Sequence, residues 1–264
     1  MSSIVSERKG KDNRGRAERE NRKALLITII VLLAMGLSTI GFIIYHQWKT
    51  RKDEEEAARI ARYEADGFHD YSDYFSSGLD KNGYVKGVSL SDSVKLVDYR
   101  NIPDMGRDDL YDEKSEETKN ETAVEYLLRF CEVQIPKDYL SLVVKRIHFR
   151  LETEYEYLSK QHQVAYGDTT APTIWESYNM TESEYEQWIR DTAEEEVTLT
   201  MILLAIAKKE NLTAERTDMK LWVLHNTAFS VDNLDELIYQ HGEPCIRRNT
   251  LEYLALKKVV ELNE

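Results

Sequence analysis

Cysteine, histidine and proline are scarce in this sequence. The chain of 264 residues holds two cysteines, Cys131 and Cys245, together with six histidines and four prolines. Neither the two cysteines nor the scattered histidines have the spacing of a metal site. Two lone cysteines far apart in a chain are more often separate buried thiols than a disulfide, although an extracytoplasmic location would allow them to pair. The sequence therefore predicts no metal site, and a disulfide is the less favoured interpretation.

The short motifs of common catalytic and cofactor sites are also missing. No glycine-rich phosphate loop, nucleophile elbow, HExxH or CxxC occurs. Positive charge is in deficit, since 35 Lys and Arg stand against 48 Asp and Glu for a formal net charge of −13. A surface of that charge is repelled by the phosphates of nucleic acids and by anionic lipid. We therefore predict no cofactor, no nucleic-acid partner and no enzymatic activity.

What the chain does contain is one long apolar run near its start. Residues 24–45, ALLITIIVLLAMGLSTIGFIIY, include no charge over 22 residues. At about 1.5 Å per residue, a helix of this length spans the roughly 30 Å hydrocarbon layer, so we interpret Ala24 to Tyr45 as a transmembrane helix. A signal peptide would have a shorter apolar region and a small-residue cleavage site, and no cysteine directly follows the run to carry a lipid.

The charges on either side of this run predict its orientation. Residues 1–23 carry eight Lys or Arg, against five in residues 46–65. Because positive residues favour the cytoplasmic side, we predict a cytoplasmic basic tail over residues 1–23 and an extracytoplasmic C-terminal part. The protein is then a single-pass protein of the cell membrane, with Trp48 in the interfacial aromatic belt.

The segment after the apolar run changes character several times. Charged helix formers continue to about Tyr63 and predict a stalk, and turn residues then predict a loop that ends near Gly83 or Gly87. From Val88 to Pro103 hydrophobic residues alternate with polar ones, which is typical of a half-buried strand. An acidic linker over residues 104–121 becomes helical from Thr122. We therefore divide this part into a stalk and loop, residues 46–83, and one domain, residues 84–264.

From residue 120 onward hydrophobic residues recur at intervals of three and four, so the predicted fold class is mainly α. Pro136 starts one long helix, and Thr181 and Glu184 form a capping box at the start of another. The second helix is apolar nearly all round from Val197 to Ala207, so it needs cover on more than one side. The first helix has a predicted solvent face of four charged residues: Lys145, Arg146, Glu152 and Lys160.

Three more helices are predicted in the final third. Thr213 caps the first, Ser230 caps the second, which ends at Gly242, and Pro244 opens the third. The first of these carries three apolar residues: Leu221, Trp222 and Leu224.

Glu196 lies on the apolar stripe of the second long helix, where a carboxylate could be an acid or base of shifted pKa. No histidine or second acid occupies a matching helical position. We therefore predict that Glu196 reaches solvent or pairs with a base, and assign it no catalytic role.

The order of these elements resembles the C-terminal domain of trigger factor, a bacterial folding chaperone, which is similar to the periplasmic chaperone SurA. Three stretches carry the resemblance: the strand that enters the linker of trigger factor, the Leu-Pro-led helix that starts the chaperone arms, and the long arm helix. Their counterparts here are YVKGVSLSDSVKLVDYRNI (84–102), VQIPKDYLSLVVKRIHFRLE (133–152) and ESEYEQWIRDTAEEEVTLTMILLAIAKKENLTAE (182–215). The resemblance covers about residues 84–264 and implies a multi-helix arm domain with a short β element.

The chain departs from that family in two places. A membrane anchor and stalk stand where the family has its ribosome-docking domain, so ribosome binding is not expected. The family also inserts an FKBP-like prolyl isomerase domain ahead of the arms. Only 32 residues separate Pro103 from Pro136, fewer than the roughly 50 that a domain needs. The resemblance therefore reaches the chaperone arms and not the isomerase.

Together with the predicted membrane helix, the resemblance implies a membrane-tethered, ATP-independent chaperone or folding factor that binds unfolded or nascent secreted polypeptides at a bacterial membrane. Such a surface would combine dispersed apolar patches, each worth a few kcal/mol. Each aromatic residue that could line it could equally fill the helix core. The candidates for substrate binding are Tyr157, Trp175, Tyr178, Trp188, Trp222 and Phe229.

Two other functions stay open. A bitopic membrane scaffold would bind one defined protein partner through its helical head, although residues 46–65 lack the sustained heptad that would favour it. A peptidyl-prolyl isomerase is a third hypothesis, which comes from the family association alone.

Overall fold

The computed structural model describes residues 46–65, 67–103, 105, 115–166 and 172–263, and these belong to two units. The first unit ends at Gly67, and its described part is one helix over residues 46–65, where the sequence predicts a stalk. The predicted basic tail, residues 1–23, and the predicted membrane helix, Ala24 to Tyr45, lie outside the described residues. Among the residues that are described, no helix is both long enough and apolar enough to cross a bilayer.

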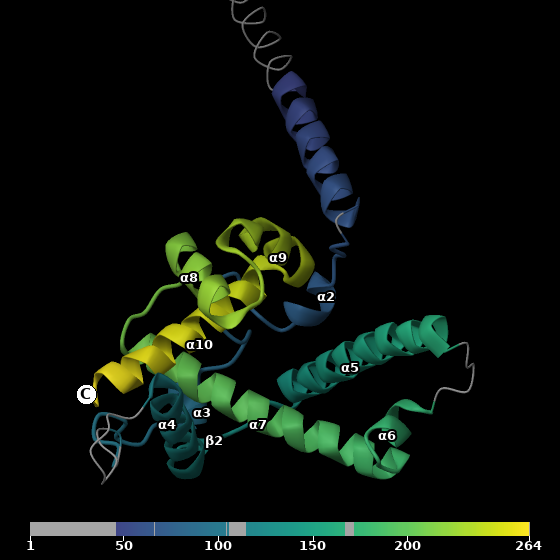
Figure 1. The fold of residues 1–264 in the computed structure, drawn as a ribbon. Coiled ribbons are helices and arrows are strands. Elements are labelled where there is room, and N and C mark those ends of the chain that lie inside the picture. The colour runs from purple at the N-terminus through teal and green to yellow at the C-terminus, as the bar shows by residue number, and fades with distance from the viewer. Residues whose placement is uncertain (1–45, 66, 104, 106–114, 167–171, 264) are drawn as a thin grey trace, which may run out of the picture. The chain divides into compact units, whose positions relative to one another are not determined.

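The second unit, Phe68–Glu264, is mainly helical with a short β element, which confirms the predicted fold class at that level (Figure 1). Its elements, in chain order, are α2 (Ser72–Phe75), α3 (Leu90–Ser93), β1 (Val94–Lys95), α4 (Glu116–Phe130), β2 (Glu132–Val133), α5 (Lys137–Tyr166), α6 (Ile174–Ser177), α7 (Glu182–Lys209), α8 (Arg216–Asn226), the 3-10 turn η1 (Val231–Asn233), α9 (Leu234–His241) and α10 (Glu243–Glu261).

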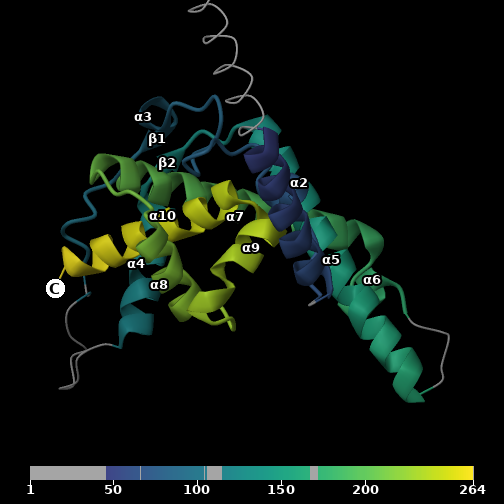
Figure 2. The same cartoon turned by 90° about the horizontal axis from the view of Figure 1, so that it is seen from above.

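The core of this unit lies where α10 crosses α7 (Figures 1 and 2). Every residue from Met201 to Ala207 is buried, which confirms that this end of α7 is covered on several sides. α10 contributes Leu251, Ala255 and Val259 to the same core. Each large apolar side chain stabilises the fold by about 1.5–3 kcal/mol when fully buried. The crossing therefore forms the base from which the other helices extend.

α5 and α7 run antiparallel and, together with α6 at their far end, form a feature that we call the arm (Figure 1). The capping box at the start of α7 is present as predicted, because Thr181 N donates to the Glu184 carboxylate over 2.8 Å. Arg146 of α5 pairs with Glu196 of α7. The prediction that Glu196 would find a base is thereby confirmed.

The burial of Arg146 corrects the predicted solvent face of α5. The residue is 6% exposed, whereas the helical projection placed it among the exposed charged residues. Arg146 lies next to Ile147, at the edge of the stripe that faces α7, and the carboxylate of Glu196 stands opposite. A buried guanidinium needs a charged hydrogen-bond partner, and the partly exposed carboxylate of Glu196 supplies one for Arg146.

The predicted strand from Val88 to Pro103 is mostly wrong. Its first half contains the helical turn α3, and the only strand within it is Val94–Lys95, paired antiparallel with Val133 and Glu132. Ser89 O accepts hydrogen bonds from Asp92 N at 3.1 Å and from Ser93 N at 3.0 Å. Leu90 and Val94 are both buried. Residues four apart lie on the same face of a helical turn and also on the same face of a strand, so their spacing does not distinguish the two.

The compact unit also begins earlier than the sequence division suggests. It starts at Phe68, whereas the predicted domain starts at residue 84. The turn before Val85 packs into the core through Leu79, and Tyr71 N donates to Gln240 O of α9 over 2.9 Å. α4 likewise begins at Glu116, capped by Ser115, before the predicted start at Thr122.

The last three helices, α8, α9 and α10, form where they were predicted. The differences are the N-cap of α8 and the face of α8 that is buried. Gly242 ends α9, and a proline lies in the first turn of α10. Thr213 does not cap α8, because Glu215 and Asp218 form the capping box instead. The buried face of α8 is formed by Met219 and Val223, which leaves the predicted apolar residues Leu221 and Leu224 exposed.

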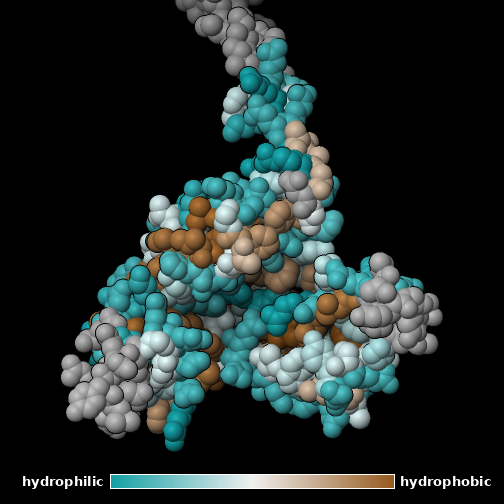
Figure 3. Space-filling view, in the orientation of Figure 1, coloured by the Kyte–Doolittle hydropathy of each residue, from teal (hydrophilic) through white to brown (hydrophobic). Residues whose placement is uncertain are grey.

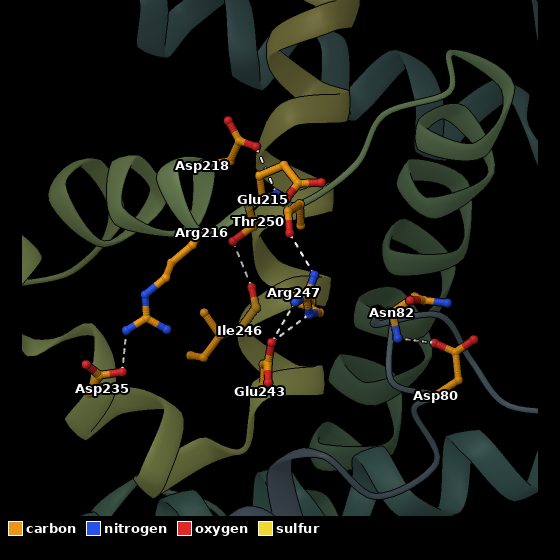
Figure 4. Close-up of polar contacts among 11 residues, drawn as sticks. Asp80, Asn82, Glu215, Arg216, Asp218, Asp235, Glu243, Ile246, Arg247 and Thr250 are labelled. Carbon is orange, nitrogen blue, oxygen red and sulfur yellow. Dashed lines mark hydrogen bonds and ion pairs between the residues drawn. The ribbon is translucent and has the colours of Figure 1, made fainter.

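Polar contacts hold α8, α9 and α10 together around a small second core (Figure 4). Arg216 of α8 reaches Asp235 of α9 at 2.5 Å. Arg247 of α10 pairs with Glu243 at 2.6 Å and donates to Ala214 O at 2.8 Å. These contacts tie the segment before α8 to α10.

Candidate functional site

The structure divides the six candidate aromatic residues between two places. Four lie on the arm, and two lie on α8 and in the segment after it. Tyr157, Tyr178 and Phe229 are exposed, as a binding role requires. Trp175, Trp188 and Trp222 are half-buried and pack against the two cores, so part of each ring has a structural role.

One aromatic cluster forms at the α6 end of the arm. The ring of Tyr178 lies 5.4 Å from that of Trp188 and 5.8 Å from that of Tyr185, and Tyr185 lies 5.9 Å from Trp188. Aromatic pairs at these distances attract one another beyond the area that they bury. Tyr185 was not among the predicted candidates, although its spacing of three from Trp188 places both on one helix face.

The turn between α6 and α7 positions Tyr178. Thr173 and Glu176 form a capping box around α6, as Thr181 and Glu184 do for α7. Between the two caps Asn179 has a φ of 56°, in the left-handed region, and Met180 N donates to Trp175 O over 3.0 Å. Capped on both sides, this turn presents Tyr178 at the surface beside Trp188.

Tyr185 is the buried member of the cluster. It is 3% exposed, and its hydroxyl has no hydrogen-bond partner within the described residues. Burial, with smaller contributions from Tyr178, Glu152 and Glu186, raises the pKa of Tyr185 to about 12. The phenol therefore stays neutral at physiological pH, and the cluster is an uncharged apolar surface.

The far half of α5 carries the most exposed apolar residues of the arm. Tyr157 and Leu158 are 61% and 55% exposed. Beyond Leu151 no described side chain of this helix is buried, so this half of α5 projects past the core. We call Tyr157, Leu158 and Tyr178 the arm patch.

Figure 3 shows the unit hollowed between the arm and the lobe that contains α4, with apolar surface beside the hollow. The aromatic residues of α2 hold the arm at its base. Tyr74 stacks on Phe149 of α5 with ring centroids 4.1 Å apart, and Phe75 meets His241 of α9 edge to face at 4.5 Å. α2 therefore connects α5 to the α9 side of the unit.

A separate cleft lies between α4, α8 and α10, with α7 beneath it. Its volume is about 270 Å³. Trp222 and Tyr253 supply aromatic walls, Leu203 and Leu256 supply apolar surface, and Asn120 supplies an amide. We call this the α4–α10 cleft.

A buried polar network underlies the α4–α10 cleft. Arg248 Nε and Nη2 donate to Asn249 Oδ1 at 3.0 and 2.6 Å, and Glu252 lies 3.6 Å from Arg248 Nε. Burial opposes the charge on Arg248, but Glu252 and its other neighbours outweigh this and raise the pKa of the guanidinium. Burial also raises the pKa of the Cys245 thiol, so that thiol is a poor nucleophile.

Cys131 and Cys245 are both free thiols, as the sequence favoured. Within the described residues no group of three or more His, Cys, Asp or Glu is arranged to hold a metal ion. The candidate sites are therefore the two surfaces described above, the arm patch and the α4–α10 cleft.

Comparison with known proteins finds no family model that matches the chain, no similar curated protein and no similar solved structure.

His241 makes the stability of this unit sensitive to acid. Burial, and then the positive charge of Arg248, lower the pKa of His241 from 6.5 to about 4. Between these values the unfolded chain binds more protons than the folded one, so the free energy of unfolding falls as the pH falls from 6.5 towards 4. The full pKa shift corresponds to a loss of about 3 kcal/mol in the free energy of unfolding. Because the His241 ring is partly exposed, we expect a smaller loss of about 2 kcal/mol.

Chemical denaturation of the full-length chain between pH 7.5 and 4.5 measures this loss. His241→Gln should flatten the pH dependence, whereas His225→Gln, at an exposed position on α8, should leave it unchanged. Equal slopes for the parent protein and His241→Gln would contradict the assignment.

Proposed function

We propose that Phe68–Glu264 is the client-binding part of a membrane-tethered, ATP-independent chaperone that holds unfolded polypeptides on its arm. The exposure of the arm patch is the observation that carries the proposal. Tyr157, Leu158 and Tyr178 leave 61%, 55% and 39% of their surfaces to solvent. Large apolar side chains left exposed on a projecting feature such as the arm are typical of contact sites. The resemblance to the arms of trigger factor supports the same function.

The strength of binding follows from the size of the patch. One large apolar side chain contributes about 1.5–3 kcal/mol when a partner covers it fully, so a single contact binds weakly. Several contacts along one flexible chain act together, because the first raises the local concentration for the next. The arm patch would therefore hold an unfolded chain reversibly, without a defined sequence and without ATP.

The charge of the arm suits a chaperone that must stay soluble. Residues 172–196 contain eight Asp or Glu and one Arg, a formal charge of −7 (1 − 8). Like charge keeps two arms from associating through their apolar residues. Exposed tyrosines and leucines are thereby available to clients rather than to a second copy.

The predicted membrane helix and stalk would give the arm its place of action. Anchoring at residues 24–45 would hold the arm close to polypeptides that emerge from the translocon. A tether raises the effective concentration of one binding partner near the other. We propose the extracytoplasmic side, since the basic residues 1–23 favour the cytoplasm for the N-terminus.

The test is suppression of aggregation by the full-length chain. We expect Tyr157→Ser, Leu158→Ser and Tyr178→Ser, combined in one variant, to require about tenfold more protein to suppress light scattering of a denatured client. All three positions are exposed, so each substitution should change the free energy of unfolding by only about 0.5 kcal/mol. Circular dichroism would verify that the variant is folded.

Phe130→Ser is the matched control, because Phe130 is 51% exposed on α4, a helix that carries no residue of the arm patch. It should suppress scattering as well as the parent protein does. Equal activity of the triple variant and the parent protein would rule out the arm patch, and no suppression by the parent at molar excess would rule out holdase activity.

A scaffold with one defined partner is the second candidate, and the exposed face of α8 is what favours it. Leu221 and Leu224 lie one turn apart and are 47% and 55% exposed. Anchors at this spacing are typical of helix-mediated recognition of one partner. A single stoichiometric partner, captured by the parent protein and lost in Leu221→Ser/Leu224→Ser, would favour the scaffold over the chaperone.

A further inference from the structure

The α4–α10 cleft is built differently from the arm patch. At about 270 Å³ it is just below the roughly 300–1,000 Å³ of pockets for drug-sized ligands, so it can accept one ring and not an extended polypeptide. Its lining mixes aromatic walls with amide, hydroxyl and charged groups, whereas the arm patch is apolar. Polar groups that converge in a pocket with apolar walls are typical of a small-molecule site.

Two hydrogen-bonding groups of the α4–α10 cleft are free to take a ligand, whereas the amides of Asn226 and Asn249 are already hydrogen-bonded. Within the part of the chain that the structure describes, the Asn120 amide and the Tyr253 hydroxyl make no hydrogen bond to another residue. Glu252 lines the cleft and is ion-paired with Arg248 over 3.6 Å, but neither its Oε1 nor Arg248 Nη1, both buried, has a hydrogen-bond partner among the described residues. In native proteins nearly all buried polar atoms have a hydrogen-bond partner. These two atoms therefore mark a place where a ligand could supply the missing hydrogen bonds.

The charges around the cleft balance. Glu116 and Lys257 are exposed residues of its lining with opposite charges. The third charged lining residue, Glu252, is compensated by Arg248, which does not line the cleft but lies 3.6 Å from the Glu252 carboxylate. A net charge near zero favours neither an anion nor a cation. The ligand that suits the cleft is therefore neutral.

We infer that the α4–α10 cleft binds a neutral, hydroxyl-rich ring of the size of one monosaccharide. Each hydroxyl both donates and accepts, so it matches the Asn120 amide, the Tyr253 hydroxyl and the Glu252 carboxylate. The C–H groups on the face of such a ring pack on the electron-rich face of the Trp222 indole. This inference is independent of client binding, because the cleft shares no residue with the arm patch.

The test uses D-glucose, D-galactose, D-mannose and N-acetylglucosamine as probes. The full-length chain would be held in a detergent without a sugar headgroup, and binding would be followed by saturation-transfer NMR. We expect at least one probe to bind, and Trp222→Leu to weaken that binding by about tenfold. Trp188→Leu, which removes an indole on the arm, should bind that probe as the parent does.

Asn120→Ala keeps the test decisive if Trp222→Leu does not fold, because Asn120 is only half-buried on α4. Loss of its hydrogen bonds should weaken binding by about fivefold. The inference is overturned if no probe gives more saturation transfer than glycerol does. It is also overturned if Asn120→Ala and Trp188→Leu both bind the probe as tightly as the parent.

Discussion

Replacing Gly83 by alanine is expected to destabilise the second unit by about 3–5 kcal/mol. Gly83 has a φ of +88°, and an added Cβ would lie 2.5 Å from Arg248 N and 2.9 Å from the carbonyl carbon of Arg247. The left-handed backbone costs a non-glycine residue about 1–2 kcal/mol, and overlap with a backbone that cannot move aside adds up to about 3 kcal/mol.

The turn around Gly83 explains why the chain comes so close to α10. Asp80 Oδ1 accepts from Asn82 N at 2.8 Å and from Tyr84 N at 3.0 Å, and Leu79 and Val85 pair across the turn. Figure 4 shows Asp80 and Asn82 of this turn. Because these contacts fix the turn, it cannot shift away from α10 to make room for a methyl group at Gly83.

Gly87→Ala is the matched control for this prediction. Gly87 also has a positive φ, +70°, but an added Cβ would meet nothing within 4 Å. It should therefore cost only the backbone strain, about 1–2 kcal/mol. Thermal or urea unfolding of the full-length variants measures both changes. Similar losses for the two variants would show that the turn is not pressed against α10.

Local signals in the sequence were enough to predict the long helices. The proline ahead of α5, the capping box of α7 and the glycine after α9 each act within one turn of the chain. The apolar run from Met201 to Ala207 likewise predicted a helix covered on several sides, and the structure buries all of it. Such features need no knowledge of the neighbouring helix.

Features that depend on a partner far along the chain were not predicted. The alternation around Leu90 suits a strand and a helical turn equally, and only packing against the core decides between them. The burial of Arg146 depends on Glu196, fifty positions away. The predicted cap at Thr213 failed because Glu215, two residues later, forms the capping box with Asp218.

The candidate sites were predictable to different degrees. The exposed tyrosines of the arm, Tyr157 and Tyr178, were among the aromatic candidates, although their exposure could not be known before α5 was seen to extend past the core. The α4–α10 cleft left no signal in the sequence beyond Trp222. Its lining comes from four helices, and no spacing within one segment brings Asn120 near Tyr253.

Replacing Arg248 by methionine is expected to cost about 3–5 kcal/mol. Arg248 is 6% exposed, and its guanidinium lies beside Glu252, whose side chain is only 22% exposed. Removing one member of a buried pair leaves the other charge without compensation. The hydrogen bonds that Asn249 Oδ1 accepts from Arg248 are lost as well.

The double variant Arg248→Met/Glu252→Leu separates the charge effect from packing. Because an apolar pair of similar volume can replace a buried ion pair at little cost, the double variant should be more stable than Arg248→Met alone. A double-mutant cycle with Glu252→Leu, by urea unfolding of the full-length chain, gives the coupling energy. If the losses simply add, the two residues do not form a pair, and the floor of the α4–α10 cleft is held by packing around Asn249 rather than by charge.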